Sequence, residues 1–251
     1  SGDIALSQNT YNWYRNHVDY IATTDFTRNE CYIPWRYYYR IIRSTNIVIN
    51  ALGGNDAQPT NAQNRWLLGQ AKALRAYSYF YLAQLYTREY NATQEVLPIY
   101  TDPAQQAQPK STTTAVYALI VDDLNDAIAA LPDRGSYAPS ERSRASVGAA
   151  RALLAKVSLY QEKWQEVINN CDAVTGYSLA TDYASQYRVS GEFDSESIFE
   201  ISGIGSSPAK GIQGYSASQG ARGAGGWGWG FNTPSESLAN AYEAGDTRRE
   251  A

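Results

Sequence analysis

Apolar side chains recur every three or four positions over most of residues 34–174, a spacing that is typical of amphipathic helices. We predict helices over residues 6–22, 34–52, 61–87, 113–131, 146–161, 163–174 and 235–244. Pro34 suits a first helical turn, where its missing N–H is not needed, and Ser111 or Thr112 can cap the helix that follows them. Each helix has one apolar face, so each needs a neighbour to cover it.

The long predicted helices follow one another as pairs with short or medium connections, which is typical of a helical repeat array. Trp66-Leu67-Leu68-Gly69, followed by Ala76 and Phe80, partly matches the tetratricopeptide pattern. Gly69 and Ala73 would let a second helix approach closely. We therefore predict a mainly α fold of tetratricopeptide-like helix pairs, with residues 1–176 as the helical repeat scaffold.

Two groups of side chains on these helices carry further expectations. The aromatic rings on the apolar stripes are expected in the core: Trp35, Tyr38 and Trp66. Acidic residues gather on one face of the 113–131 helix, and we expect this face to be solvated: Asp122, Asp123 and Asp126.

The pattern changes after residue 176. Residues 177–251 are rich in Gly and Tyr and contain few long periodic runs. Within them, Glu196 to Ile201 is predicted as a short strand and Gly203 to Gly230 as loop. We predict that residues 177–251 form a loop-rich segment with a short strand, the start of a ligand-binding subdomain.

The segment Trp227-Gly228-Trp229-Gly230-Phe231-Asn232 has the chemistry that a sugar ring requires. Aromatic faces can lie against the C–H groups of the ring, and the glycines leave those faces accessible. Nearby polar side chains could add hydrogen bonds. The candidate ligand-binding residues are Trp227, Trp229, Phe231, Asn232, Tyr215 and Arg222. The alternative is that this loop packs its aromatic rings onto the domain surface.

Composition narrows the function classes. The formal net charge is −4, which argues against a nucleic-acid partner because phosphate binding needs a basic face. His17 is the only histidine, no G-x-S-x-G or phosphate-loop motif is present, and no metal-ligand cluster is found. We expect no catalytic residue, no metal and no cofactor. Glu192, Asp194 and Glu196 leave a glycoside hydrolase as a less favoured alternative.

The order of several motifs resembles the SusD/RagB family of outer-membrane nutrient-binding lipoproteins. The motifs that carry the resemblance are Trp35-x-x-Tyr38-x-x-Ile41-Ile42, Gly69-Gln70-Ala71-Lys72-Ala73-Leu74-Arg75-Ala76-Tyr77, Leu97-Pro98-Ile99, Val116-Tyr117-x-x-Ile120-x-x-Asp123-Leu124, Arg144-Ala145-Ser146, Glu196-Ser197-Ile198-Phe199-Glu200 and Asn232-x-Pro234.

The resemblance implies a SusD-like α–α superhelix and a protein that captures oligosaccharide without turnover. It further implies delivery to a SusC-like TonB-dependent transporter, on which the helical array would rest. The expected location is the extracellular face of the outer membrane, through a lipid anchor not present in this chain. Family members are longer, so a region after Ala251 is expected. A tetratricopeptide adaptor that binds peptide in its concave groove is the alternative from another class.

Overall fold

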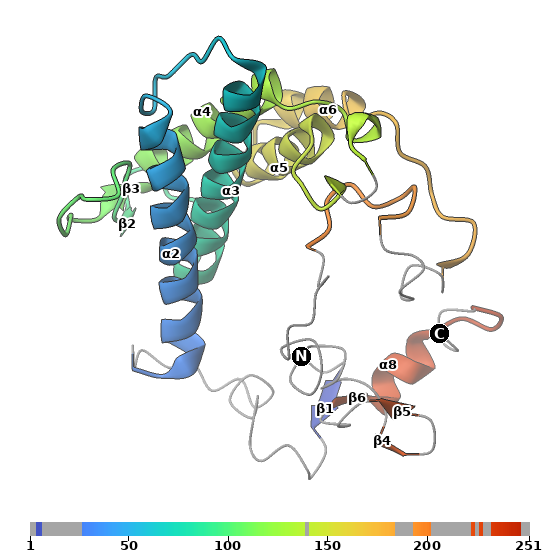
Figure 1. Ribbon diagram of the computed structural model, residues 1–251. Helices are drawn as coiled ribbons and strands as arrows, with labels where there is room; N and C mark the ends of the chain where they lie inside the picture. The colour runs from blue at the N-terminus through green and yellow to red at the C-terminus, as the bar shows by residue number, and fades with distance from the viewer. Residues whose placement is uncertain are drawn as a thin grey trace. The chain divides into compact units, whose positions relative to one another are not determined.

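The computed structural model describes residues 4–6, 27–138, 141–183, 193–201, 222–223, 226–227 and 232–246. The described residues fall into two compact units. The larger unit contains the long helices, one short strand pair and the segment 193–200. The described part of the smaller unit contains two short strand pairs and one short helix. The prediction of a mainly α fold is confirmed (Figure 1).

Five helices build the larger unit, and each packs against the next along the chain (Figure 1). They are α2 (Asn29–Ala51), α3 (Ala62–Tyr86), α4 (Thr113–Ala130), α5 (Val147–Tyr160) and α6 (Trp164–Asp172). Side-chain oxygens cap three of their N-termini, because Asn61, Thr112 and Ser146 each accept a hydrogen bond from a backbone N–H in the first turn. The predicted helix 6–22 lies outside the described residues, except that Leu6 belongs to a strand.

Pro34 does not begin its helix as predicted, because α2 starts at Asn29 and contains Pro34. A proline inside a helix disturbs the ladder of backbone hydrogen bonds. Tyr86 of α3 compensates, since its hydroxyl accepts a hydrogen bond from the Trp35 N–H at 2.9 Å and donates one to the Cys31 carbonyl. An uninterrupted helix would join that N–H to that carbonyl directly.

The core of the larger unit lies between α2, α3, α4 and α5. Its fully buried side chains include Ile42, Phe80, Ile120 and Val157. The predicted close helix approach is present at Gly69, where an added Cβ would lie 2.9 Å from the Ala130 Cβ and 3.0 Å from the nearest Leu131 methyl. The aromatic residues expected in the core are half-buried and pack against it: Trp35, Tyr38 and Trp66.

One expectation about polar side chains is corrected. Asp123 is buried rather than solvated, because it pairs with Arg75 of α3. Asp126 is partly exposed and pairs with Lys72.

Within the part of the chain that the structure describes, no helix has the length and apolar character needed to span a bilayer.

Short strands appear in three antiparallel pairs among the described residues. In the larger unit, β2 (Glu95–Leu97) pairs with β3 (Ser111–Thr112). In the smaller unit, β1 (Ile4–Leu6) pairs with β6 (Asn232–Pro234), and β4 (Arg222–Gly223) pairs with β5 (Gly226–Trp227). The smaller unit also contains α8 (Glu236–Ala241), which is capped by the Ser235 side chain.

The strand predicted over Glu196 to Ile201 is not formed. The Asp194 carboxylate instead accepts hydrogen bonds from the N–H groups of Glu196 and Ser197, both at 3.0 Å. Arg134 donates to the carbonyls of Ser197 and Phe193. These side chains use the backbone groups that a strand partner would need, so the segment follows turns and bends across the helices.

Candidate functional site

The predicted ligand segment lies in the smaller unit, where the structure describes its backbone at two places. In the β4–β5 pair, Arg222 lies opposite Trp227 and Gly223 opposite Gly226. The segment predicted as loop therefore contains a short antiparallel strand pair. In the β1–β6 pair, Asn232 lies opposite Leu6, which ties the end of the segment to the beginning of the chain.

The other predicted ligand residues, Tyr215, Trp229 and Phe231, lie outside the described residues. For Arg222, Trp227 and Asn232 the backbone alone is described. The structure thus brings Arg222 and Trp227 into one strand pair, and the ligand role of all six residues stays a prediction.

The acidic residues that could serve a glycoside hydrolase have structural partners. Asp194 caps two backbone N–H groups, and Glu196 accepts a hydrogen bond from the Ala180 N–H at 2.9 Å. Glu200 accepts one from the Phe193 N–H at 2.8 Å. The third candidate, Glu192, lies outside the described residues. The described carboxylates hold the 193–200 segment in place, and this use of them does not favour a catalytic pair.

A pocket of about 440 Å³ opens between α2 and the loop 98–107 of the larger unit. Side chains from α2 form one wall and include Trp35, Tyr39 and Arg43. The loop forms the other wall, with Tyr100 and Asp102 among its lining residues. We call this cavity the α2 pocket.

Rings in the α2 pocket contact one another in tilted and edge-to-face geometries. The Trp35 and Tyr39 centroids are 4.8 Å apart at 47°, and the Tyr39 and Tyr100 centroids are 5.8 Å apart at 85°. The Tyr39 hydroxyl donates a hydrogen bond to the Pro98 carbonyl at 2.9 Å, which ties the loop to α2. These contacts fix the positions of the rings relative to the loop.

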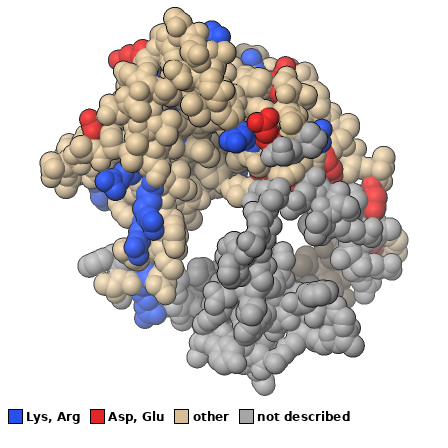
Figure 2. Space-filling model, viewed as in Figure 1, with Lys and Arg blue, Asp and Glu red and all other residues tan. Residues whose placement is uncertain are grey.

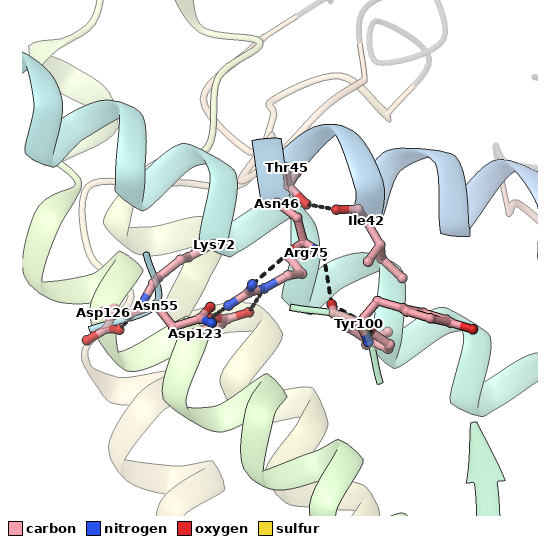
Figure 3. A network of polar contacts seen from close by, with 10 residues as sticks. Ile42, Thr45, Asn46, Asn55, Lys72, Arg75, Tyr100, Asp123 and Asp126 are labelled. Carbon is pink, nitrogen blue, oxygen red and sulfur yellow. Dashed lines mark hydrogen bonds and ion pairs between the residues drawn. The ribbon is translucent and has the colours of Figure 1, made fainter. Parts of the chain in front are cut away.

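A buried polar network holds the loop from below (Figure 3). Asn46 of α2 donates from Nδ2 to the Tyr100 carbonyl at 2.8 Å and accepts at Oδ1 from Arg75 of α3, also at 2.8 Å. The guanidinium of Arg75 is completely buried and donates two 2.7 Å hydrogen bonds to the carboxylate of Asp123 on α4. Tyr79 adds a hydroxyl that accepts from the Tyr100 N–H at 2.7 Å.

Burial shifts the ionisation of this network. Removal from water raises the pKa of the Asp123 carboxyl, and the hydrogen bonds and charge of Arg75 oppose that rise. Burial likewise raises the pKa values of the Tyr39 and Tyr79 hydroxyls. Neighbouring tyrosines add to the rise at Tyr39, whereas the backbone hydrogen bond to Tyr100 and the charge of Arg75 oppose it at Tyr79. Both hydroxyls therefore stay protonated at neutral pH and serve as hydrogen-bond donors.

Sequence reasoning missed the α2 pocket. Trp35 lies on a stripe that also faces the core, so its pattern predicted packing alone. Tyr100 and Asp102 follow an extended stretch in a loop, and their approach to α2 depends on contacts with residues more than 20 positions away. The repeated prolines at 98 and 103 were the available signal of a stiff loop beside the helices.

Comparisons with known proteins agree with this architecture. A family model described as SusD-like, "Starch-binding associating with outer membrane", matches residues 2–159. SusD-like protein P25 of Formosa agariphila is 28% identical over 174 residues, which are 66% of this chain and 31% of that protein. The chain therefore spans about a third of the length of this curated relative.

Solved structures show the same fold. A SusD-like protein from Bacteroides fragilis superposes with a TM-score of 0.72 at 23% identity, covering 97% of this chain and 48% of that one. A structure described as a laminarin binding SusD-like protein superposes with a TM-score of 0.64 at 28% identity, covering 79% of this chain and 43% of that one.

Proposed function

Because the chain belongs to the SusD-like family, we propose that it captures oligosaccharide at the outer membrane and passes it to a SusC-like TonB-dependent transporter. The observation that carries the proposal is the family match over residues 2–159. This range includes most of helices α2 to α6, which we call the helical frame. The family description supports association with the outer membrane, and the likeness to a laminarin-binding relative supports a glycan as the ligand.

The proposed site is the aromatic segment of the smaller unit, with Trp227, Trp229 and Phe231 as stacking surfaces. Arg222, Asn232 and Tyr215 would supply hydrogen bonds to hydroxyl groups. The β4–β5 pairing supports this assignment, because it brings Arg222 and Trp227 opposite each other in one strand pair. Capture needs no bond cleavage, so we propose binding without turnover.

We further propose a lipid-anchored location on the extracellular face of the outer membrane, with the helical frame resting on the transporter. The exposed apolar side chains of the larger unit support a partner surface there. They include Tyr37 and Ile47 on α2 and Trp164 and Ile168 on α6. This part of the proposal goes beyond the glycan site and is independent of which glycan binds.

Calorimetric titration of the chain with defined oligosaccharides tests the glycan site. Laminarihexaose, maltohexaose, xylohexaose and trigalacturonate form the panel. We expect at least one to bind, and the double variant Trp227→Ala/Trp229→Ala to weaken that binding at least tenfold, because two stacking surfaces are lost. Far-UV circular dichroism should keep its helical signal.

Trp164→Ala is the matched control, since it removes an indole that is 60% exposed on α6 of the other unit. It should bind the glycan as the parent chain does. Binding of peptides without any glycan would replace the proposal with the peptide adaptor. Release of reducing sugar from the panel would replace it with a hydrolase.

A further inference from the structure

The α2 pocket contains the elements of a saccharide site, and it uses none of the residues of the proposed aromatic segment. Its volume of about 440 Å³ falls in the range of roughly 300–1,000 Å³ that is usual for small-ligand pockets. Aromatic and proline side chains line much of it, with Trp35 and Tyr39 presenting half-buried rings. Such a wall suits the C–H face of a pyranose ring.

The walls of the pocket are fixed by the protein's own contacts. Asn46 and Tyr79 both bind the backbone of Tyr100, and Tyr39 binds the carbonyl of Pro98. The Arg75–Asp123 pair beneath them is buried and holds Asn46 in place (Figure 3). A ligand would therefore enter a preorganised cavity and lose little free energy to ordering of the loop.

Polar groups of opposite kinds face the pocket from its two walls. Arg43 on α2 is exposed and supplies hydrogen-bond donors alone, whereas Asp102 on the loop is exposed and supplies acceptors. Gln105 on the loop can do both. Hydroxyl groups of a sugar both donate and accept, so a ring lying on the aromatic wall could bind a guanidinium with one hydroxyl and a carboxylate with another.

Arg43 differs from the other arginines along α2. Figure 2 shows a column of basic side chains over this helix. Arg36 lies over the Tyr32 ring at 5.7 Å and Arg40 over the Tyr37 ring at 5.9 Å. Among the described residues, Arg43 has neither a carboxylate partner nor a ring beneath its guanidinium, and it lines the pocket. It is therefore available to a ligand.

We propose that the α2 pocket is a second binding site, for a neutral pyranose unit of a saccharide. Because Arg43 and Asp102 offset each other, the lining favours a neutral ring over an acidic one. The proposal rests on the proposed function for its ligand class. It adds a site on the helical frame that could hold a further part of a long glycan.

Hydrogen exchange of the full chain with and without laminarihexaose tests the location. We expect protection of the backbone amides in 99–107 in addition to any protection in 222–232. Titration then tests the chemistry in the Trp227→Ala/Trp229→Ala background. There Arg43→Ala and Asp102→Asn should each weaken the remaining binding about tenfold or more, because each removes hydrogen bonds to a charged group.

Arg40→Ala is the matched control, since it removes an exposed arginine from the same helix outside the pocket. Asp102→Asn keeps an oxygen for the Ala104 N–H that Asp102 now caps at 2.7 Å, so the loop should keep its fold. Thermal melts of all variants should coincide within the error of the measurement.

The outcomes separate the two proposals. Protection restricted to 222–232, with Arg43→Ala equal to Arg40→Ala, would overturn the second site and leave the proposed function intact. Loss of all binding in Arg43→Ala, with none lost in the tryptophan double variant, would support the α2 pocket and overturn the aromatic segment. Preference of the pocket for trigalacturonate over every neutral hexamer would overturn the neutral ligand, and no binding by any saccharide would overturn both proposals.

Discussion

Arg75 joins three helices through one buried guanidinium. It lies on α3, bonds Asp123 on α4 and bonds Asn46 on α2, and all three side chains are almost fully buried. A buried ion pair contributes little net stability over apolar residues of the same volume, but removal of one partner leaves an uncompensated charge. The network therefore fixes the relative register of α2, α3 and α4 and, through the Tyr100 carbonyl, the wall of the α2 pocket.

Asp123→Asn should destabilise the protein by about 3–5 kcal/mol, because it leaves the Arg75 cation buried without its counter-charge. Urea unfolding followed by circular dichroism measures this change. The control is Asp122→Asn, at the neighbouring position on α4, where the side chain is exposed. This substitution should change stability by about 0.5 kcal/mol or less. Equal effects of the two substitutions would contradict the structural role of the buried pair.

The spacing of the apolar residues in α4 indicates that Asp123 lies on the buried face of this helix. Val116, Ile120, Asp123 and Ala127 are spaced by four, three and four, so Asp123 lies on the buried stripe. The sequence nevertheless predicts a solvated carboxylate there, because burial of an unpaired charge is costly. The partner that removes that cost lies 48 positions earlier in the sequence, and a pattern within one helix does not reveal it.

Helix packing at the element scale depends on Gly69. The missing side chain lets α3 lie against the end of α4, where Ala130 and Leu131 occupy the space that a Cβ would take. Gly69→Ala adds the helix propensity of alanine, about 1 kcal/mol. Overpacking should outweigh that gain, so we expect a net loss of roughly 1–2 kcal/mol in urea unfolding.

Gly135→Ala is the control for that substitution. Gly135 lies in the short 3₁₀ helix η1 (Arg134–Ser136), and an added Cβ there would meet nothing within 4 Å. Its stability should match that of the parent to within about 0.5 kcal/mol. A Gly69→Ala variant at least as stable as the parent would show that α3 and α4 can separate without cost.

Elements whose determinants are local were predicted from the sequence, and those held by distant residues were not. Asn61, Thr112 and Ser146 cap helices within their own first turns, so their positions follow from the neighbouring residues. The segment after Phe193 contains Ile198, Phe199 and Ile201, which are residue types enriched in strands. Its conformation instead depends on Arg134, which is 63 positions away from Ser197. The ligand role of the aromatic segment stays a prediction. The α2 pocket was not predicted, because its two walls come from parts of the chain that are distant in the sequence.

Tyrosine is abundant in the whole molecule, with 21 residues in the chain, and several rings join helices of the larger unit. Tyr38 of α2 stacks on Tyr81 of α3 with centroids 6.2 Å apart, and Tyr77 lies 4.5 Å from Tyr81. Tyr117 of α4 contacts Phe80 of α3 edge to face. These rings carry ionisable hydroxyls, so the packing of the frame depends on their staying neutral.

This dependence predicts alkaline unfolding. Burial is the main cause that raises the pKa values of Tyr77 and Tyr117 from the usual 10 to about 12. Between pH 10 and 12 the unfolded chain therefore releases protons that the folded chain retains. The stabilisation from these two groups is fully present below pH 10 and is lost as the pH rises toward 12.

Urea unfolding at pH 8, 10, 11 and 11.5 measures the loss, and absorbance at 295 nm reports tyrosinate. We expect the free energy of unfolding to fall above pH 10. In Tyr117→Phe it should fall less steeply, by up to about 1.4 kcal/mol per pH unit, because one of the linked protons is absent. The Gln84 hydrogen bond to Tyr117 is also lost in this variant, which lowers stability at every pH without changing the slope. Identical slopes for parent and variant would mean that Tyr117 ionises as easily in the folded frame as in the unfolded chain, so burial would not govern its pKa.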